Sequence, residues 1–347
     1  MALFLILLLF LCCYQMKLVP VKEFNREYIS KNSTTAIKGI FTFLVFMTHF
    51  ADCSSSNTIL DTPYLIMRSH MGQLVVTMFL FYSGFGIYES IKKRGDDYLK
   101  SFPKNRLLKT LLHFDCAVIL FYIVGTLMGQ RFTLTKFLLS LMGWSSLGNS
   151  NWFIFAILMQ YIMVYCSFKI FRNRKILALV FVTVLSCFYI LIMLRYKERS
   201  WYDTAFCLPF GLWYSFCKEK IESLVMKNNI YYYSSLITVM VIFAVLYLKR
   251  GNLVLFELCA MLFALMIVMF TMKVKIGNKM LYWLGNHVFS IYILQRIPMM
   301  VFKKVDFISS NFFVFFIVCF VITVIMSEYF DKLIKIIDSI IFKISRK

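Results

Sequence analysis

The chain has 347 residues, of which 61% are hydrophobic and only 16% are charged. A soluble domain averages about half apolar residues and about a quarter charged ones, so one globular core could not bury this much apolar surface. Glycine and proline are few, at 13 and 5, which leaves no room for a long flexible linker. The composition therefore excludes an ordinary soluble protein and predicts a single integral membrane domain.

Runs of about 20 apolar residues bounded by charges predict membrane-spanning helices, because a helix rises about 1.5 Å per residue across about 30 Å of hydrocarbon. The run 2–18 lacks a basic N-terminal region and a small-residue cleavage site, so we expect an anchor helix rather than a cleaved signal. The segment 132–146 is too short to span and is expected at the interface or as a re-entrant piece. The predicted fold is an all-α, polytopic transmembrane helical bundle. Its eleven predicted spans are 2–18, 35–51, 71–90, 107–129, 151–171, 175–194, 202–217, 230–248, 253–272, 282–301 and 311–331.

The net charge of +21 is at first sight typical of a nucleic-acid-binding protein, but the positions of the charges argue against that role. Alternate loops, beginning with 17–31, carry 25 of the 38 lysines and arginines, and the intervening loops carry 10. Such alternation follows the positive-inside rule and predicts an N-terminus outside and a C-terminus in the cytoplasm. The basic residues are expected to set topology and to contact anionic membrane lipids, and no nucleic-acid partner is expected.

Two other classes of function are disfavoured by the absence of their motifs. The ten cysteines form no CxxC pair and no Cys/His spacing typical of a metal site, so no metal or redox role is expected. No Walker or Rossmann glycine pattern is present and no internal repeat is obvious, which argues against an ATP-driven pump.

The stretch TAIKGIFTFLVFMTHF (35–50) carries Lys38 and His49 into a predicted span. They are 11 residues apart, close to three helical turns, so both lie on one helix face about 16 Å apart along the axis. Ionisable groups inside a membrane helix usually mark a functional site. The alternatives are that Lys38 extends to the lipid headgroups and that His49 only bonds a neighbouring helix. Asp52 follows three residues later, placed either to fix the imidazole tautomer or simply to be solvated at the helix end.

The next predicted span contains FLFYSGFGI (79–87), in which Ser83 and Gly84 are small enough to let a helix or a ligand approach the backbone. A basic loop follows, and Arg106 and Lys109 open the next span at positions i and i+3. A cationic patch there is suited to binding phosphate. Plain helix packing and ordinary positive-inside charge are the alternatives.

In these segments the chain resembles the acyltransferase-3 family of integral membrane acyltransferases. The stretch 35–50 is similar to the family's first conserved helix, although Lys38 stands where the family has an arginine. Gln295 stands where a late histidine often occurs, so a second proton relay there is lost or reassigned. The similarities keep the family's order over 35–330, so ten predicted helices correspond and the first is additional. The other similar segments are 79–87, FPKNRLLKTL (102–111), NSNWFIFAILMQY (149–161), CLPFGLWYSF (207–216) and LGNHVFSIYILQRIP (284–298).

The resemblance implies that an acyl group, expected to be acetyl, passes from cytosolic acyl-CoA to a hydroxyl on a cell-surface polysaccharide or lipid-linked sugar outside a bacterial plasma membrane. His49 is the expected general base or, alternatively, an acyl carrier, with Asp52 as its orienting partner. Ser83 is a candidate donor to the thioester oxygen. The expected binding residues for the acetyl-CoA donor are Lys38, Gly84, Arg106, Lys109 and His113.

Three further residues are candidates for binding the acceptor sugar. Glu257 lies about one turn inside a predicted span, where it either contacts the sugar or pairs with a basic group. Trp201 and Asp203 lie at the predicted outer rim, where an aromatic platform with a carboxylate suits a sugar. Aromatic residues at that depth are, however, usually part of the interfacial belt. His113 is similarly ambiguous, because a buried hydrogen bond would also explain it.

The predicted organisation is an N-terminal anchor and linker over 1–34, a transmembrane acyltransferase domain over 35–331 and a basic cytoplasmic tail over 332–347. A multi-span transporter or flippase of a lipid-linked glycan is the alternative function. Such proteins often contain inverted repeats and broken helices, and neither is clear from the sequence. A glycan polymerase or ligase would be expected to carry a larger outer loop than the predicted 130–150.

Overall fold

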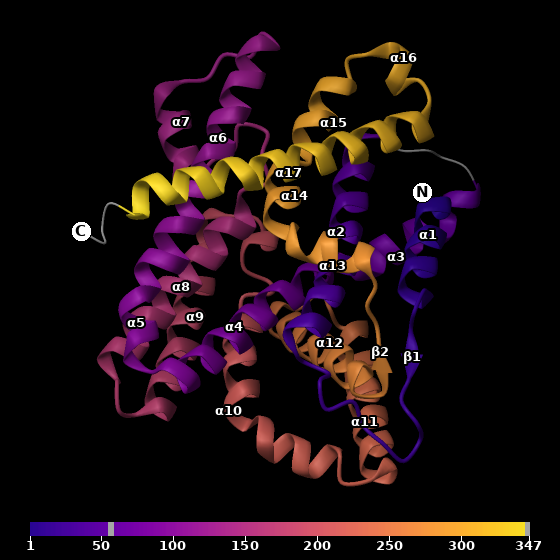
Figure 1. Cartoon of the computed structure of the whole chain (residues 1–347), viewed down its shortest axis with the longest axis vertical. Coiled ribbons are helices and arrows are strands. Elements are labelled where there is room, and N and C mark those ends of the chain that lie inside the picture. The colour runs from indigo at the N-terminus through magenta and orange to yellow at the C-terminus, as the bar shows by residue number, and fades with distance from the viewer. Residues whose placement is uncertain (55–58, 344–347) are drawn as a thin grey trace.

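The computed structural model describes residues 1–54 and 59–343, and over these residues the chain is almost entirely helical (Figure 1). Eight helices in the described part are long and apolar enough to cross a membrane. This confirms the predicted polytopic all-α bundle. The eight are α2 (Lys31–Cys53), α4 (Leu74–Arg94), the continuous run of α5 (Asp96–Phe102), η2 (Pro103–Leu108) and α6 (Lys109–Leu127), then α8 (Trp152–Ile170), α9 (Lys175–Tyr196), α11 (Asn229–Leu248), α12 (Leu253–Lys273) and α17 (Phe312–Lys343).

The remaining elements are shorter or less apolar, and two of them form a small antiparallel sheet in which Lys17 lies opposite Lys275. The sheet consists of β1 (Lys17–Leu18) and β2 (Val274–Lys275). The other helices are α1 (Ala2–Cys13), η1 (Ile59–Asp61), α3 (Thr62–Met71), α7 (Leu134–Leu141), η3 (Arg199–Trp201), α10 (Cys207–Val225), α13 (Lys279–Asn286), α14 (Val288–Leu294), α15 (Arg296–Phe302) and α16 (Asp306–Ser309).

Three predicted spans differ from the helices that form. The run 2–18 becomes the 12-residue α1, which at about 1.5 Å per residue is too short to cross the hydrocarbon. The run 202–217 becomes α10, which starts later and continues into a charged half, KEKIE, that is too polar to be lipid-exposed. The run 282–301 is interrupted at His287 and Gln295 into α13, α14 and α15. This broken helix is not apparent from the sequence.

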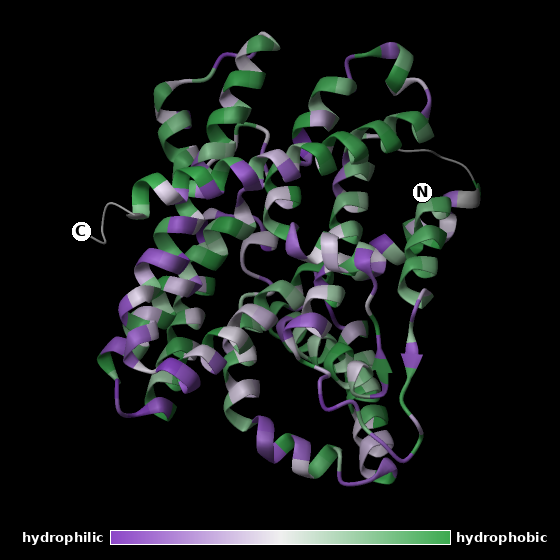
Figure 2. Cartoon of the chain, in the orientation of Figure 1, coloured by the Kyte–Doolittle hydropathy of each residue, from purple (hydrophilic) through white to green (hydrophobic). Residues whose placement is uncertain are grey.

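The helix α2 lies inside the bundle, next to α17 (Figure 1). Its buried aromatic side chains contact those of α17. Phe43 lies 5.3 Å from Phe320 between ring centroids, and Phe50 lies 4.9 Å from Phe315. Figure 2 shows that most of the helices are hydrophobic along their length, with many hydrophilic residues in the connecting segments and along the end of α10. A polar side chain on α2 is therefore surrounded by protein rather than by lipid.

Paired glycines bring two pairs of helices into close contact. A Cβ atom built on Gly84 of α4 would lie 2.1 Å from the carbonyl oxygen of Leu208 in α10, and one on Gly211 would lie equally close to the Phe81 carbonyl. Gly39 of α2 and Gly285 of α13 make the same kind of contact, with distances of 2.2 and 1.9 Å to opposing carbonyls. Small residues allow such approaches between membrane helices.

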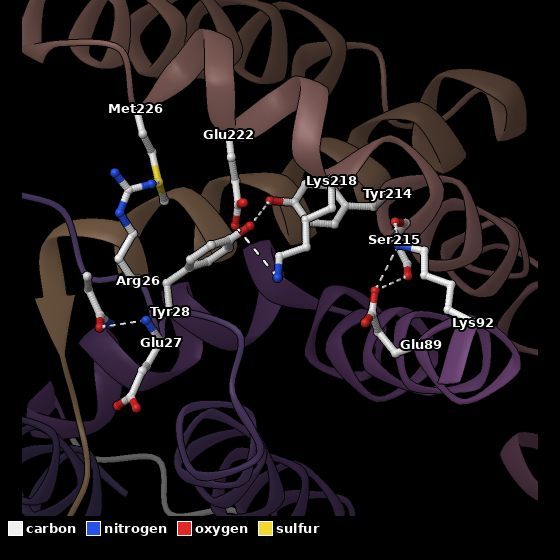
Figure 3. Close-up of polar contacts among 11 residues, drawn as sticks. Arg26, Glu27, Tyr28, Glu89, Lys92, Tyr214, Ser215, Lys218, Glu222 and Met226 are labelled. Carbon is white, nitrogen blue, oxygen red and sulfur yellow. Dashed lines mark hydrogen bonds and ion pairs between the residues drawn. The ribbon is translucent and has the colours of Figure 1, made fainter. Parts of the chain in front are cut away.

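Polar side chains join α4 and the segment before α2 to the charged half of α10 (Figure 3). The hydroxyls of Tyr28 and Tyr214 share a hydrogen bond at 2.9 Å, and Ser215 donates to Glu89 at 2.6 Å. Lys92 also donates to the carbonyl oxygen of Ser215. These contacts tie both the segment before α2 and the helix α4 to the same part of α10.

We expect Gly84→Ala and Gly86→Ala to change stability in opposite directions. Gly84 faces a backbone carbonyl, so a methyl group must push α4 from α10 at a cost of about 1–3 kcal/mol. Gly86 has no atom within 4 Å of its built Cβ, and alanine at an open helix position is favoured over glycine by about 1 kcal/mol. Thermal unfolding of the purified protein in detergent measures both variants, and equal shifts would contradict this account of the packing.

Candidate active site

A cavity of about 590 Å³, here called the first cavity, lies inside the bundle between α2, α4, α8 and α14. Its wall is mainly apolar, with polar groups at intervals. Such a composition is typical of small-molecule sites. The polar residues that line it are Lys31, Thr34, Lys38, Thr42, Tyr82, Ser83, Ser90, Arg106, Tyr161, Tyr292 and Gln295.

One face of α2 forms a wall of the first cavity. Lys38, Thr42 and Val45 line the cavity at positions i, i+4 and i+7, and His49 follows at i+11 on the same face. The helix is capped at its start by Ser30, whose side chain accepts a hydrogen bond from a backbone N–H of the first turn. The predicted stripe is therefore present, with a cation near one end and the histidine at the other.

The cationic part of the first cavity combines Lys38 with Arg106, which lies in the π-helical turn η2. Single π-helical turns inside α-helices are frequent at functional sites. The Nε of Arg106 donates to the Tyr98 hydroxyl at 3.3 Å, and its guanidinium lies 5.9 Å from the centre of the Tyr161 ring. Arg106 therefore supplies the planar donor fork that a lysine at position 38 lacks.

Ser83 lines the first cavity, but Gly84 does not. The Ser83 hydroxyl shares a hydrogen bond with the Tyr161 hydroxyl at 2.8 Å, so both oxygens face the same space. Gly84 points to α10, and the structure gives no support to its expected role in binding the donor. Gly86, two residues later, lines the cavity instead.

His49 meets Gln295 and Ser150 at its Nδ1 atom, at 2.9 Å from Gln295 Nε2 and 3.4 Å from Ser150 Oγ. Gln295 Nε2 also donates to the carbonyl oxygen of Tyr292 at 3.2 Å, which fixes the orientation of the amide. The amide nitrogen can only donate, so His49 Nδ1 accepts, and the proton of the neutral ring resides on Nε2.

Asp52 does not orient His49 in the described part of the chain. Its carboxylate instead forms an ion pair with Arg68 of α3, and a second oxygen lies 3.9 Å from Arg296 Nη2. The i+3 spacing brings Asp52 near the histidine along the helix, but the arginines of α3 and α15 attract it away. Gln295 fills the orienting role predicted for Asp52.

Lys109 and His113 lie on α6 away from the first cavity. Both pair with Asp338 of α17, the lysine at 3.1 Å and the histidine at 3.0 Å. An opposite charge already satisfies these two groups, so their geometry does not support the predicted contact with a donor phosphate. Their structural role is to join α6 to the end of α17.

A second cavity of about 460 Å³ lies at the His49 end of the bundle, between the 144–152 segment and the 196–201 segment. Ser150, which contacts His49, is part of its wall, as is Arg296. His49 therefore stands between the two cavities, with Gln295 lining one and Ser150 lining the other.

Trp201 lines the second cavity, but its ring is already occupied. The ammonium of Lys197 lies 4.2 Å from the centre of the Trp201 ring and 3.8 Å from the centre of the Trp144 ring. Lys197 also donates to the Trp144 carbonyl oxygen at 2.7 Å, and burial lowers the pKa of this lysine. The predicted aromatic platform for a sugar is therefore used to hold the two segments together.

Glu257 and Asp203 lie next to each other in structure but not in the second cavity. The Glu257 carboxylate accepts the backbone N–H groups of Ala205 and Phe206, both at 3.1 Å, at the start of α10. A carboxylate there is stabilised by the helix dipole, so Glu257 is explained by capping rather than by a sugar. Asp203 lies 3.6 Å from Arg199, an ordinary ion pair.

Several residues that line the cavities or contact His49 were not predicted from the sequence as site residues. Gln295 stands out only as a departure from the family pattern, although it makes the shortest contact to His49. No motif singles out Ser150, Tyr161, Tyr292 or Arg296 as a site residue. The available signal is local: Ser150 lies inside the similar segment 149–161, and Tyr292 lies three residues before Gln295 in SIYILQ.

Comparison with known proteins assigns the chain to a family. No curated protein and no solved structure matches the chain. A family model described as an acyltransferase domain matches residues 31–328, which include the second cavity, all lining residues of the first cavity except Ile29, and every helix from α2 to about half of α17. The match covers most of the chain, so this protein belongs to the acyltransferase-3 family and is a membrane acyltransferase.

Proposed function

We propose that the protein transfers an acyl group, in the simplest case acetyl, from cytosolic acyl-CoA to a hydroxyl of an extracytoplasmic cell-surface polysaccharide. The observation that carries this proposal is the position of His49, in contact with one residue of each cavity. One cavity then holds the donor and the other admits the acceptor. The imidazole lies where the two substrates would meet.

The first cavity suits the donor because its charge and its apolar walls match the two ends of acyl-CoA. Lys38 and Arg106 are available for phosphate groups, as a point charge and as a bidentate fork respectively. The apolar wall suits the acyl-bearing arm. In the proposed topology this end of the bundle faces the cytoplasm of a bacterial cell, which the basic loops at this end support by the positive-inside rule.

The reaction assigns a proton path to His49. The acceptor oxygen attacks the thioester carbonyl, the C–S bond breaks, and the hydroxyl proton passes to His49 Nδ1 and then to the departing thiolate. Ser150 Oγ, 3.4 Å from Nδ1, marks how a hydroxyl can approach that nitrogen. In the resting site the Nδ1 lone pair accepts the Gln295 N–H, so the acceptor hydroxyl must replace that N–H at Nδ1 before it gives up its proton. An acyl-histidine formed at the same nitrogen is the alternative.

The first cavity also contains donors for the developing oxyanion. The Tyr292 hydroxyl has no hydrogen-bond partner among the described residues, and the Ser83 and Tyr161 hydroxyls lie on the same cavity. Hydroxyl donors fixed in a water-poor site stabilise negative charge better than water does. In this scheme Ser83 retains its predicted role beside the thioester oxygen.

His49→Ala should lower acyl transfer by about 10²–10⁴-fold while leaving the protein folded in the membrane, because it removes the general base. The measurement is transfer of label from radiolabelled acetyl-CoA to extracted surface glycan by purified protein in vesicles. His70→Ala is the matched control, since His70 is exposed on α3 and lines neither cavity. Wild-type transfer by His49→Ala would refute the catalytic role, and uptake of intact glycan without transfer would indicate a flippase.

Lys38→Ala should raise the KM for acetyl-CoA by about 10- to 100-fold, the loss expected for a charged hydrogen bond. Lys38→Arg should preserve or improve KM, because arginine restores the bidentate donor. Lys100→Ala removes the same charge from the exposed surface of α5 and should leave KM within about twofold. Equal KM values for the alanine and arginine variants would exclude phosphate binding by residue 38.

A further inference from the structure

Arg296 joins two cavities at the His49 end of the bundle. It lines the second cavity, together with Ser150, and a third cavity of about 370 Å³ that Lys136 and Met300 also line. The residue before it in the chain is Gln295, which contacts His49. A molecule that passed from one cavity to the other would therefore meet the Arg296 guanidinium close to the imidazole.

The guanidinium of Arg296 has donors to spare. It makes no hydrogen bond to any residue in the described part of the chain, and its Nε is buried without a partner. Its ion pair with Asp52 is long, at 3.9 Å from Nη2 and beyond hydrogen-bond distance, and that carboxylate also binds Arg68. A half-buried arginine with its fork unused is arranged to receive a carboxylate or a phosphate.

A second unused donor lies in the same wall. The side-chain nitrogen of Asn149 is buried with no partner among the described residues, and Asn149 lines the second cavity with Arg296. Buried N–H groups are nearly always paired, so an orphaned one beside a cavity indicates a missing ligand or water. Two N–H sources thus border one cavity.

The charges around these cavities are mostly positive. The third cavity contains Lys136 and Arg296 in its wall and no acidic residue, and the second contains Lys197 and Arg296 against Glu198. Basic residues are normally kept off the outer side of a membrane protein. Their concentration beside the proposed acceptor cavity, on the outer side in the topology above, therefore calls for a negatively charged partner.

We propose that Arg296 binds a carboxylate or phosphate of an anionic glycan and so presents a nearby hydroxyl of that glycan to His49. The proposal rests on the proposed function and narrows its acceptor to acidic polysaccharides. A chain lying across the second and third cavities would be held at its middle by the guanidinium. Arg296 then determines which acceptor is used, and takes no proton itself.

Binding of defined oligosaccharides to the full-length protein in phosphatidylcholine nanodiscs tests this directly. The probes are trigalacturonate, its carboxyl-reduced neutral counterpart and a glycerol-phosphate trimer. At least one anionic probe should bind about 10- to 100-fold more tightly than the neutral trimer, and salt near 0.3 M should weaken it. Equal binding of all three probes to the wild type would overturn the proposal.

Substitutions at Arg296 test whether this residue causes the preference for the anionic probe. Arg296→Gln should abolish the preference for the anionic probe, and Arg296→Lys should retain part of it, because lysine keeps the charge without the fork. Arg250→Gln makes the same charge change in the 249–252 turn, which lines neither cavity, and should leave the preference intact. An unchanged preference in a folded Arg296→Gln protein, judged by its thermal unfolding, would overturn the proposal.

The role of Arg296 can fail while the proposed acyltransferase reaction stands. Transfer of label from acetyl-CoA that depends on His49 but is equal for charged and neutral acceptors would sustain the acyltransferase reaction and refute the role of Arg296. Repeating the binding with phosphatidylglycerol in the nanodisc distinguishes glycan from lipid. If anionic lipid abolishes binding of the anionic probe at low salt, the site belongs to headgroups and the proposal fails.

Discussion

The contact between His49 and Gln295 is the interaction on which the site depends. It joins α2 to the break between α14 and α15, sets the tautomer of the imidazole and places it between two cavities. A histidine in an apolar bundle without such a partner would have an unpaired ring nitrogen, which costs free energy. The hydrogen bond therefore accounts for the stability of a polar group at this depth.

Close packing of the backbone makes this contact possible. Gly39 and Gly285 bring α2 against α13, and the chain then continues through α14 to Gln295 on the same side of α2. The interruptions at His287 and Gln295 let the late segment change direction inside the bundle. Broken helices are common in transporters because they line cavities, and the same physical reason applies to an acyltransferase that must admit two substrates.

At two positions where the chain departs from the family pattern, the structure shows what the residue present there, or a neighbouring one, provides. Lysine at position 38 lacks a bidentate fork, and Arg106 supplies one at the same cavity from a π-helical turn. Glutamine at position 295 cannot relay a proton, but its amide orients the remaining histidine. No histidine is among the described residues that line the first cavity, so His49 reaches it only through its contact with Gln295.

The sequence by itself determined the membrane-spanning helical class, the order of the helices and the Lys38–His49 stripe, because apolar length and helical period are local properties. The resemblance to the acyltransferase-3 family is also carried by short segments of the chain, so it too follows from the sequence alone. The sequence was less informative about which side chains act on or bind the substrates. Six residues that were predicted to do so contact other parts of the protein instead: Asp52, Gly84, Lys109, His113, Trp201 and Glu257. Only the tertiary structure decided which partner each of these side chains has. A partner on another helix depends on packing between segments far apart in the chain, and His49 and Gln295, for example, are 246 residues apart.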